Sequence, residues 1–277
     1  MAVDLDRSYF RLRTFRDELP NQEREILVDN RIWFGAIRDM DDVFEGRPRF
    51  IFGNSRVDRD EMIALSRRME PDLTEAERQD QVQRIVDSNA NPVIREITMA
   101  WQQYDEEQLY ASSSVCCFSK GPPTQRQWHY YAGQGKGYAL IFDLSHPWRM
   151  QSVRDGTAID VIPRPVHYSP ERVRPTIELS FRSRSTAKHW KDVERALLTK
   201  SKDWDDQLEY RFVRIGLAPR LVDFPPESLV GVAFGYEMSA QKKDQLVGLL
   251  QERSTPVELF EARVSATHLA IDLVQVA

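Results

Sequence analysis

The stretch WDDQLEYRF, residues 204–212, alternates polar and apolar side chains from residue 207 onward. Its polar members are Gln207, Glu209 and Arg211, and apolar residues fill the positions between them. Because successive side chains of a strand point to opposite faces, this spacing predicts a strand with one apolar face and one row of amide, carboxylate and guanidinium. Such a row is a solvated surface, a structural ion pair or an active face, and the spacing leaves all three open.

Stretches of this kind recur through the chain, and helical patterns interrupt them. Alternation and β-rich composition predict strands at residues 7–15, 31–37, 113–119, 137–144, 158–169, 208–217, 229–235, 256–264 and 268–276. Apolar residues at three- and four-residue spacing predict helices at 21–30, 185–201 and 239–253, and a helical block over 58–110. The order predicts one α+β domain over residues 1–277, with a largely antiparallel sheet and with 58–110 as a helical block or insertion.

Charge is unevenly distributed along the chain. The net charge of -5 argues against a protein coated in positive charge for bulk nucleic-acid binding. Residues 164–202, however, hold ten Lys/Arg and four Asp/Glu, a net +6 that leaves -11 for the remainder. This basic segment is either a solvated face of a helix and loops, as such runs usually are, or a patch for phosphates or an acidic partner.

The sequence lacks several common patterns, and their absence reduces the number of functional classes to consider. Cys116 and Cys117 are the two cysteines, and neighbours on a strand point to opposite faces, so we expect no disulfide framework. The sequence holds no HExxH, no paired CxxC and no acidic calcium loop, so we expect no metal. No apolar window reaches the roughly 20 residues that a membrane span needs, so we expect a cytoplasmic protein without a membrane partner.

Three ordered blocks of sequence resemble a known family. They are YFRLRTF…LVDNRIWFGAIRDMDDVFEG (9–15 and 27–46), VCCFSKGPPTQRQWHYYAGQGKGYALIFDL (115–144) and LLTKSKDWDDQLEYRFVRIG (197–216). Their order and wording resemble the bacterial domain of unknown function 2971. That family has an Asn-Asp-Pro-Phe-Asp turn where this chain has DDVFE at 41–45, and it tends to have Glu-x-Glu where this chain has Gln207-Leu208-Glu209. The family name implies no activity.

A looser similarity, to mono-ADP-ribosyltransferases, supplies a candidate activity. Those enzymes combine an arginine on an early strand, a serine on a middle strand and a Glu/Gln-x-Glu motif on a late strand. The resemblance implies NAD as the substrate and a protein or nucleic acid as the acceptor. The matching residues are Arg11 or Arg13 for the arginine, Ser119 or one of the serines at 112–114 for the serine, and Gln207 with Glu209 for the motif.

These residue types suit the chemistry of that reaction. Positive charge develops on the ribose carbon as nicotinamide leaves NAD, and a fixed carboxylate such as Glu209 stabilises it and orients the 2′-hydroxyl. Gln207, on the same strand face, is expected to contact the acceptor. Arginine grips pyrophosphate or ribose with paired hydrogen bonds, and tyrosine rings stack on nicotinamide. The expected contacts to NAD are Arg11, Arg13, Ser119, Tyr9, Tyr130, Tyr131 and Arg211.

Two hypotheses therefore stand. In the first, the protein is an NAD-dependent ADP-ribosyltransferase or NAD hydrolase that acts as a toxin or defence effector. In the second, it is a non-catalytic or nucleic-acid-binding module that uses the basic segment 164–202, and Glu209 is purely structural. The enzyme gains support if Arg11 or Arg13, Ser119 and Glu209 converge on one cleft, and fails if they are spread over separate faces.

Overall fold

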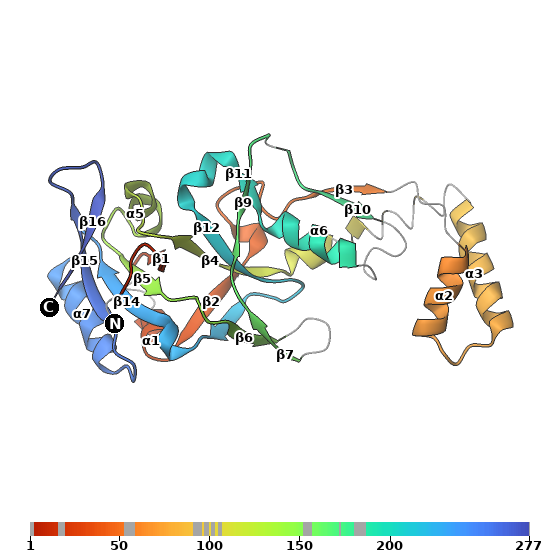
Figure 1. Ribbon diagram of the computed structural model, residues 1–277, viewed down its shortest axis with the longest axis horizontal. Coiled ribbons are helices and arrows are strands. Elements are labelled where there is room, and N and C mark those ends of the chain that lie inside the picture. The colour runs from red at the N-terminus through yellow and green to blue at the C-terminus, as the bar shows by residue number, and fades with distance from the viewer. Residues whose placement is uncertain are drawn as a thin grey trace.

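The structure is a computed structural model of the chain (Figure 1). It describes residues 3–15, 20–52, 59–90, 107–151, 157–171, 173–179 and 187–276, together with residues 96, 100, 103 and 104. The described part is a mixed α+β fold whose main sheet is largely antiparallel, which confirms the predicted fold class.

The main sheet runs in the order β13-β2-β4-β1-β5-β14-β15-β16. Neighbouring strands are antiparallel except β14 and β15, which are parallel. β12 branches from β4, and β8 pairs with β12. The bounds of these strands are β1 (Tyr9–Arg13), β2 (Arg31–Ala36), β4 (Ser114–Lys120), β5 (Tyr138–Phe142), β8 (Arg164–Pro165), β12 (Glu209–Arg214), β13 (Arg220–Asp223), β14 (Leu229–Phe234), β15 (Glu258–Val264) and β16 (Ile271–Gln275).

The sheet branches at β4 because this strand has three partners. On one side β12 pairs along it from Glu209 to Arg214. On the other side β1 pairs only with residues 119–120 of β4, and β2 pairs only with residues 114–115. Residues 116–118 thus have no strand partner on that side within the described chain. We call this gap between β1 and β2 the slot.

Apolar side chains cover both faces of the sheet. On one face Trp148 stacks on Phe212 and Phe224, with ring centroids 4.5 and 5.5 Å apart, and α1 (Pro20–Leu27) and α7 (Ala240–Gln251) close this cluster. On the other face α5 (Gln125–Tyr131) brings Trp128 against Phe10. α6 (Ala187–Leu197) covers a third cluster that contains the start of β4. The branch point of the sheet is therefore held between packed layers.

Short ladders flank the main sheet. They pair β3 (Arg49–Phe52) with β10 (Thr176–Leu179), β9 (His167–Ser169) with β11 (Thr199–Ser201), and β6 (Trp148–Gln151) with β7 (Ala158–Val161). The sequence pattern does not predict β3 or β10, because each is stabilised by a partner far along the chain rather than by its own alternation.

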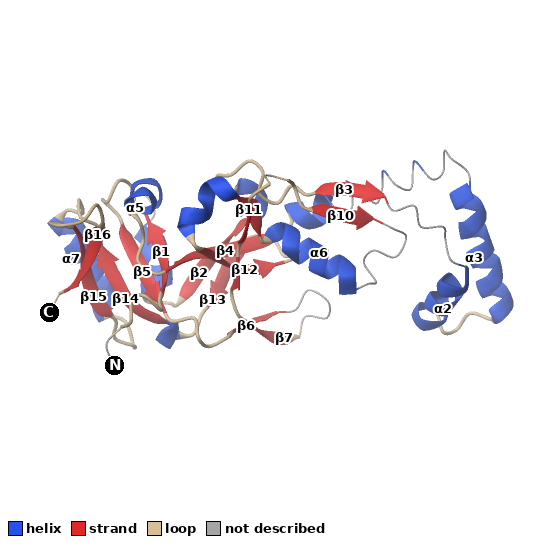
Figure 2. Cartoon of the chain, turned by 45° about the horizontal axis from the view of Figure 1, so that its top comes forward, coloured by secondary structure: helices blue, strands red, loops and turns tan. Residues whose placement is uncertain are grey.

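α2 (Arg59–Met69) and α3 (Glu75–Ala90) form a hairpin that stands apart from the sheet in Figures 1 and 2. Arg67 joins them through two hydrogen bonds to Glu75, at 2.8 and 2.9 Å, and the buried Arg78 donates to Ser66 at 2.9 Å. These helices confirm the first part of the helical block predicted over 58–110. The last predicted helix of that block covers residues 91–110, and most of its residues up to 106 lie outside the described part.

Two predicted elements are wrong in their extent. The helix predicted over 185–201 ends at Leu197, because residues 199–201 form β11 against β9, and residues 185–186 lie outside the described chain. The single strand predicted over 158–169 is three short ones, β7, β8 and β9. Pro163 and Pro165 lack the N–H that an uninterrupted ladder requires.

Candidate functional site

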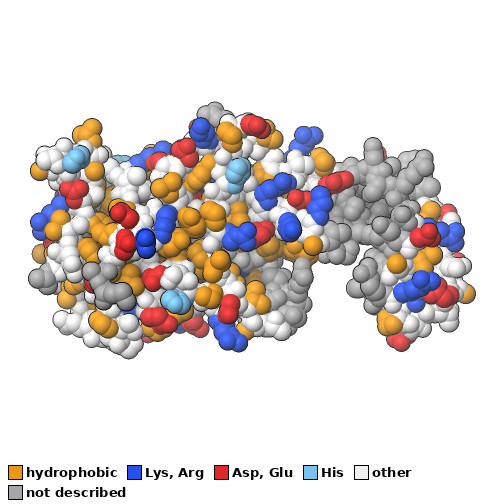
Figure 3. All heavy atoms as spheres, viewed as in Figure 1, with side chains coloured by type: hydrophobic (Ala, Val, Ile, Leu, Met, Phe, Trp, Pro, Cys, Tyr) orange, Lys and Arg blue, Asp and Glu red, His pale blue; other side chains and the backbone are white. Residues whose placement is uncertain are grey.

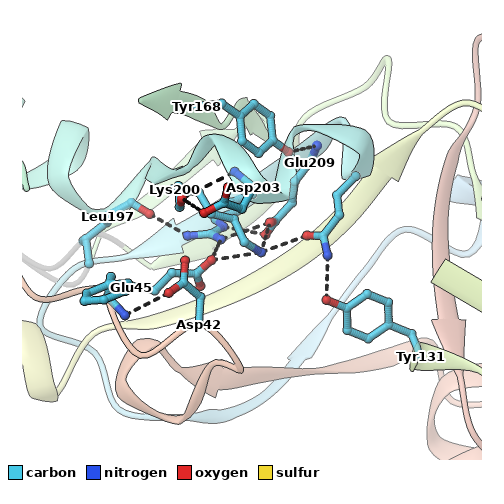
Figure 4. Close-up of polar contacts among 12 residues, drawn as sticks. Asp42, Glu45, Tyr131, Tyr168, Leu197, Lys200, Asp203 and Glu209 are labelled. Atoms are coloured by element: carbon cyan, nitrogen blue, oxygen red, sulfur yellow. Dashed lines mark hydrogen bonds and ion pairs between the residues drawn. The ribbon is translucent and has the colours of Figure 1, made fainter. Parts of the chain in front are cut away.

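The first and third of the three sequence blocks meet at the start of β12. Glu45 from the first block and Lys200, Glu209 and Arg211 from the third form a group that we call the ion cluster (Figure 4). All four side chains are buried, with at most 6% of any residue exposed. Two anions face two cations, as burial of charge requires.

Arg211 forms a bidentate contact with the Glu209 carboxylate. Its Nε donates to Glu209 Oε1 at 2.6 Å and its Nη2 to Oε2 at 3.0 Å. Nη2 also donates to Glu45 Oε1 at 2.9 Å, and Nη1 donates to the carbonyl oxygen of Leu197, at the end of α6, at 2.9 Å. Such bidentate contacts fix the plane of a carboxylate as well as its position. Glu209 is therefore a rigid group.

Lys200 completes the ion cluster. Its Nζ lies 3.0 Å from Glu209 Oε2, 2.9 Å from Glu45 Oε1 and 2.8 Å from Gln207 Oε1. An ammonium has three N–H donors and no acceptor, so these three contacts use all of them. The short strand β11 presents Lys200 inward because β9 pairs beside it.

The ion cluster keeps Glu209 ionised. Burial alone would raise the pKa of Glu209, but the charge and hydrogen bonds of Arg211, helped by Lys200, hold that pKa to about 2. Burial also opposes the charge on Lys200, and Glu209 with Glu45 outweigh it and raise the pKa of Lys200. Next to Glu209, burial raises the pKa of the Cys117 thiol well above its usual range. The site thus offers a fixed anion and a protonated thiol, and no ready nucleophile.

The ion cluster borders a cleft of about 750 Å³, which is within the usual range for small-molecule sites. Lys200, Gln207 and Glu209 line its inner part. Two exposed aromatic rings also line it, Trp33 on β2 and Tyr130 on α5, with 49% and 63% of their surface accessible. A cleft with a buried charge and open aromatic walls suits a ligand with a planar ring and polar groups.

The structure brings most of the predicted residues to this cleft. Phe10 lies opposite Ser119 in the ladder, so alternation puts Arg11 and Arg13 on the other face of the sheet from Ser119 and Glu209. They reach one cleft because the slot opens the sheet between those faces. The predicted residues that line it are Arg11, Arg13, Ser119, Tyr130, Tyr131, Gln207 and Glu209.

Arg11 lies in the slot itself. Its Nη1 donates to the carbonyl oxygen of Cys117 at 3.1 Å and to Cys116 Sγ at 2.9 Å, and its Nη2 donates to the carbonyl oxygen of Trp33 at 3.3 Å. These partners are neutral, and no described carboxylate pairs with Arg11. Arg13 instead forms an ion pair with the buried Glu23 of α1 at 3.6 Å. The sequence left the two arginines equivalent, and the contacts now separate them.

Helix α5 places the tyrosines of the second block. Thr124 and Gln127 form a capping box at its start, which fixes where the helix begins. Gln127 Nε2 then donates to Ser119 Oγ at 2.7 Å and to the carbonyl oxygen of Gln207 at 3.2 Å. Tyr131, one turn later, accepts from Gln207 Nε2 at 2.8 Å. Ser119 and Tyr131 are thus tied to the segment that precedes Glu209.

Three predicted residues lie differently from the expected arrangement. Tyr9 is not among the residues that line the cleft, and its ring packs edge-on against Tyr210 at 5.1 Å. Arg211 is fully buried behind Glu209 and does not line the cleft either. Gln207 is not on the strand, because it ends a short 3-10 helix (Lys202–Gln207) and Leu208 then turns the chain with φ 45°.

Four of the seven described cations of the basic segment pair with carboxylates. Arg164 pairs with Glu194 at 3.4 Å, Lys188 with Asp192 at 2.8 Å and Arg195 with Asp192 at 3.2 Å, while Lys200 is in the ion cluster. Over α6 and β10 in Figure 3, acidic and basic side chains are interspersed. These ion pairs reduce the positive charge that the described part of segment 164–202 presents; Arg172, Arg182 and Arg184 lie outside the described residues.

Sequence reasoning missed three residues of the site. Glu45 and Lys200 both stand in the quoted blocks, but no local spacing shows that they meet Glu209. Trp33 alternates outward on β2, and an exposed tryptophan beside a polar site is the signal that would have found it.

Two kinds of feature are absent from the described residues. No group of three or more His, Cys, Asp and Glu side chains among them is placed to hold a metal ion. None of their helices is both long enough and apolar enough to cross a membrane.

Comparison with known proteins gives one match. The family model described as "Protein of unknown function (DUF2971)" matches residues 127–212, which run from α5 through β12 and include Lys200, Gln207, Glu209 and Arg211. No curated protein and no solved structure matches the chain. The match supports the resemblance to that family over this part of the chain.

Proposed function

We propose that the cleft binds NAD and that the protein cleaves the bond between nicotinamide and ribose, transferring ADP-ribose to an acceptor or to water. One observation carries the proposal. An ionised, immobilised carboxylate, Glu209, and a guanidinium with only neutral described partners, Arg11, line the same cleft. NAD needs both, because it carries an anionic pyrophosphate and develops positive charge at the ribose.

In this proposal Glu209 acts as a fixed hydrogen-bond acceptor and anion. A carboxylate has about four acceptor positions, and Arg211 and Lys200 use three of them on Glu209. The Cys117 thiol, a weak donor, lies at the remaining one. A ribose 2′-hydroxyl is a stronger donor and takes that position. Because Glu209 is already oriented, it stabilises the charge that develops on C1′ without reorganising.

The other groups of the cleft bind the rest of NAD. Arg11 presents its remaining N–H groups to the pyrophosphate from the slot, where guanidinium geometry matches two phosphate oxygens. Trp33 and Tyr130 offer ring faces to the planar nicotinamide or adenine. Tyr9 and Arg211 have no contact with NAD in this arrangement.

The reaction balances without a metal or redox partner. The bond between C1′ and the nicotinamide nitrogen breaks, and its electron pair leaves with nicotinamide, which departs uncharged. An oxygen or nitrogen of the acceptor, or water in hydrolysis, forms the new bond to C1′ and releases one proton to solvent. The cellular role that we propose is that of a toxin or defence effector, from the resemblance to ADP-ribosyltransferases.

The alternative function, a nucleic-acid-binding module, has less support. Its basis was the net charge of segment 164–202, and four of the seven described cations of that segment are paired with carboxylates. Phosphate binding with a strong salt dependence needs free cations. A filter-binding assay with single-stranded and duplex nucleic acid at low and high salt tests this alternative directly.

Incubation of the purified protein with NAD tests the proposed enzymatic activity. We expect nicotinamide release, and a loss of about 100-fold or more in Glu209→Gln. Glu45→Gln is the matched control, because it removes a carboxylate from the same ion cluster but not from the cleft, and we expect a much smaller loss. Equal activity in wild type and Glu209→Gln would remove Glu209 from the mechanism. No release and no NAD binding by the folded wild type would refute the proposal.

A further inference from the structure

We infer that the Tyr131 hydroxyl points its hydrogen into the cleft as a fixed hydrogen-bond donor, because Lys200 sets the direction of the hydrogen bonds that run through Gln207. The ligand atom that it meets is then an acceptor. The inference deepens the proposed function and rests on it for the identity of that ligand. In NAD, the acceptor that we assign is the carboxamide oxygen of nicotinamide.

The first step is the orientation of the Gln207 amide. The oxygen and nitrogen of an amide are told apart by their neighbours, and Lys200 is a neighbour that only donates. Its Nζ lies 2.8 Å from one end of that amide, which must be the oxygen. The opposite orientation would bury the NH₂ group against an ammonium, with neither able to accept. Gln207 is 6% exposed, so solvent does not relieve such a contact.

The second step is the bond between Gln207 and Tyr131. With its oxygen held by Lys200, the amide turns its nitrogen toward Tyr131 Oη, at 2.8 Å, and donates (Figure 4). The tyrosine oxygen is therefore the acceptor of this bond. The amide uses its oxygen on Lys200 and one of its two N–H groups on Tyr131, so Gln207 positions Tyr131.

The third step is the hydrogen of Tyr131. No other hydrogen bond joins the Tyr131 hydroxyl to a described residue, and Tyr131 lines the cleft. Burial raises the pKa of Tyr131, helped by the charges of Asp41 and Glu209, and the opposing charge of Lys200 and the hydrogen bond from Gln207 do not reverse this. The hydroxyl is thus protonated at neutral pH, and the cleft is where its hydrogen finds a partner.

The direction of the bond is testable without any ligand. A donor to the tyrosine oxygen favours the phenolate, whereas an acceptor of its hydrogen favours the phenol. Gln207→Met removes the amide with little change of shape and no change of charge. If Gln207 donates, the pKa of Tyr131 rises in this variant by about 0.5 to 1 pH unit. If Gln207 accepts, the same pKa falls.

The measurement uses fluorine NMR of protein with 3-fluorotyrosine, which ionises at lower pH than tyrosine, at the nine tyrosine positions. Tyr131→Phe identifies the resonance. Gln22→Met is the matched control, because it makes the same exchange at another glutamine that lines the cleft, and it should leave the titration of Tyr131 unchanged. A fall, or no change, in Gln207→Met would overturn the inference.

A measurement on the unsubstituted protein covers the case in which Gln207→Met does not fold. Nuclear Overhauser contacts are expected between the side-chain NH₂ of Gln207 and the ring hydrogens of Tyr131. Contacts from that NH₂ to the Lys200 side chain in place of Tyr131 would contradict the assigned orientation.

Calorimetric measurement of NAD binding tests whether the Tyr131 hydroxyl contacts NAD. We expect Tyr131→Phe to bind NAD about 3- to 10-fold more weakly than wild type. Equal binding would show that the hydroxyl does not meet the ligand and would overturn the inference. A wild type that neither binds nor cleaves NAD would refute the proposed function, while the fluorine titration still decides the direction of the hydrogen bond.

Discussion

Replacing Glu209 by glutamine should reduce stability in a pH-dependent way. The ion cluster lowers the pKa of Glu209 from 4.5 to about 2, which corresponds to about 3 kcal/mol of folding free energy. Because the folded pKa is the lower one, this contribution is present above pH 4.5 and is lost as the pH falls toward 2. Glu209→Gln also leaves Arg211 with less compensation, so we expect a total loss of about 3–5 kcal/mol at pH 7.

Urea unfolding at a series of pH values measures this effect. The six tryptophans report the transition, and Trp148 is stacked in the core next to β12. The difference in unfolding free energy between wild type and Glu209→Gln should shrink by about 2 kcal/mol between pH 6 and pH 3, because wild type loses the contribution of Glu209 and the variant has none to lose.

The result that would refute this reasoning is a difference that stays constant with pH. It would mean that Glu209 is not ionised more readily in the folded protein than in the unfolded chain. The double variant Glu209→Gln/Arg211→Met tests whether the two residues are energetically coupled. It removes the guanidinium that Glu209→Gln alone leaves without its carboxylate partner. We expect it to be less destabilised than the sum of its single variants by about 1–3 kcal/mol. Additive losses would contradict the coupling.

Three other predictions follow from local features. Leu208→Gly should raise the free energy of unfolding by about 0.5–1 kcal/mol in urea melts, because a left-handed leucine that is 58% exposed is strained and contributes little packing; a loss would contradict this. Trp148→Ala should cost about 3–5 kcal/mol in the same assay, because the ring is fully buried. Cys116 and Cys117 should resist a chromogenic thiol reagent at pH 8 until urea unfolds the protein, because burial raises the pKa of Cys116 to about 11 and also raises that of Cys117 well above its usual range. Rapid reaction of the folded protein would contradict this.

The alternating strands were predictable because their information is local. β1, β4 and β12 carry their periodicity in their own residues, and their side chains take the faces that the pattern assigns. Of the three interpretations of the polar row, the ion pair between Glu209 and Arg211 is correct, and Glu209 also faces a cleft. The position of Gln207 does not follow the alternation, because it depends on contacts with Lys200 and Tyr131. No spacing within residues 204–212 reveals those contacts.

The partners of the site depended on folding at long range. Glu45 meets Arg211 across 166 positions of the chain, and Glu23 of α1 pairs with Arg13, which leaves Arg11 to the slot. Where the resembling family tends to carry glutamate, this chain has Gln207, and a carboxylate there would have no hydrogen to donate to Tyr131. The difference between Gln207 and the glutamate of the family can therefore be explained only from these contacts.

The branching of the sheet also limits how this protein can change. β4 borders three strands, and each of residues 114–119 pairs with β12 on one side and with β1, β2 or the slot on the other. A substitution in β4 therefore moves the wall that carries Glu209 and the wall that carries Arg11 together. Variants with a new ligand preference should arise at the rim, in α5 and around Trp33, while a library that randomises β4 should yield mostly unfolded chains.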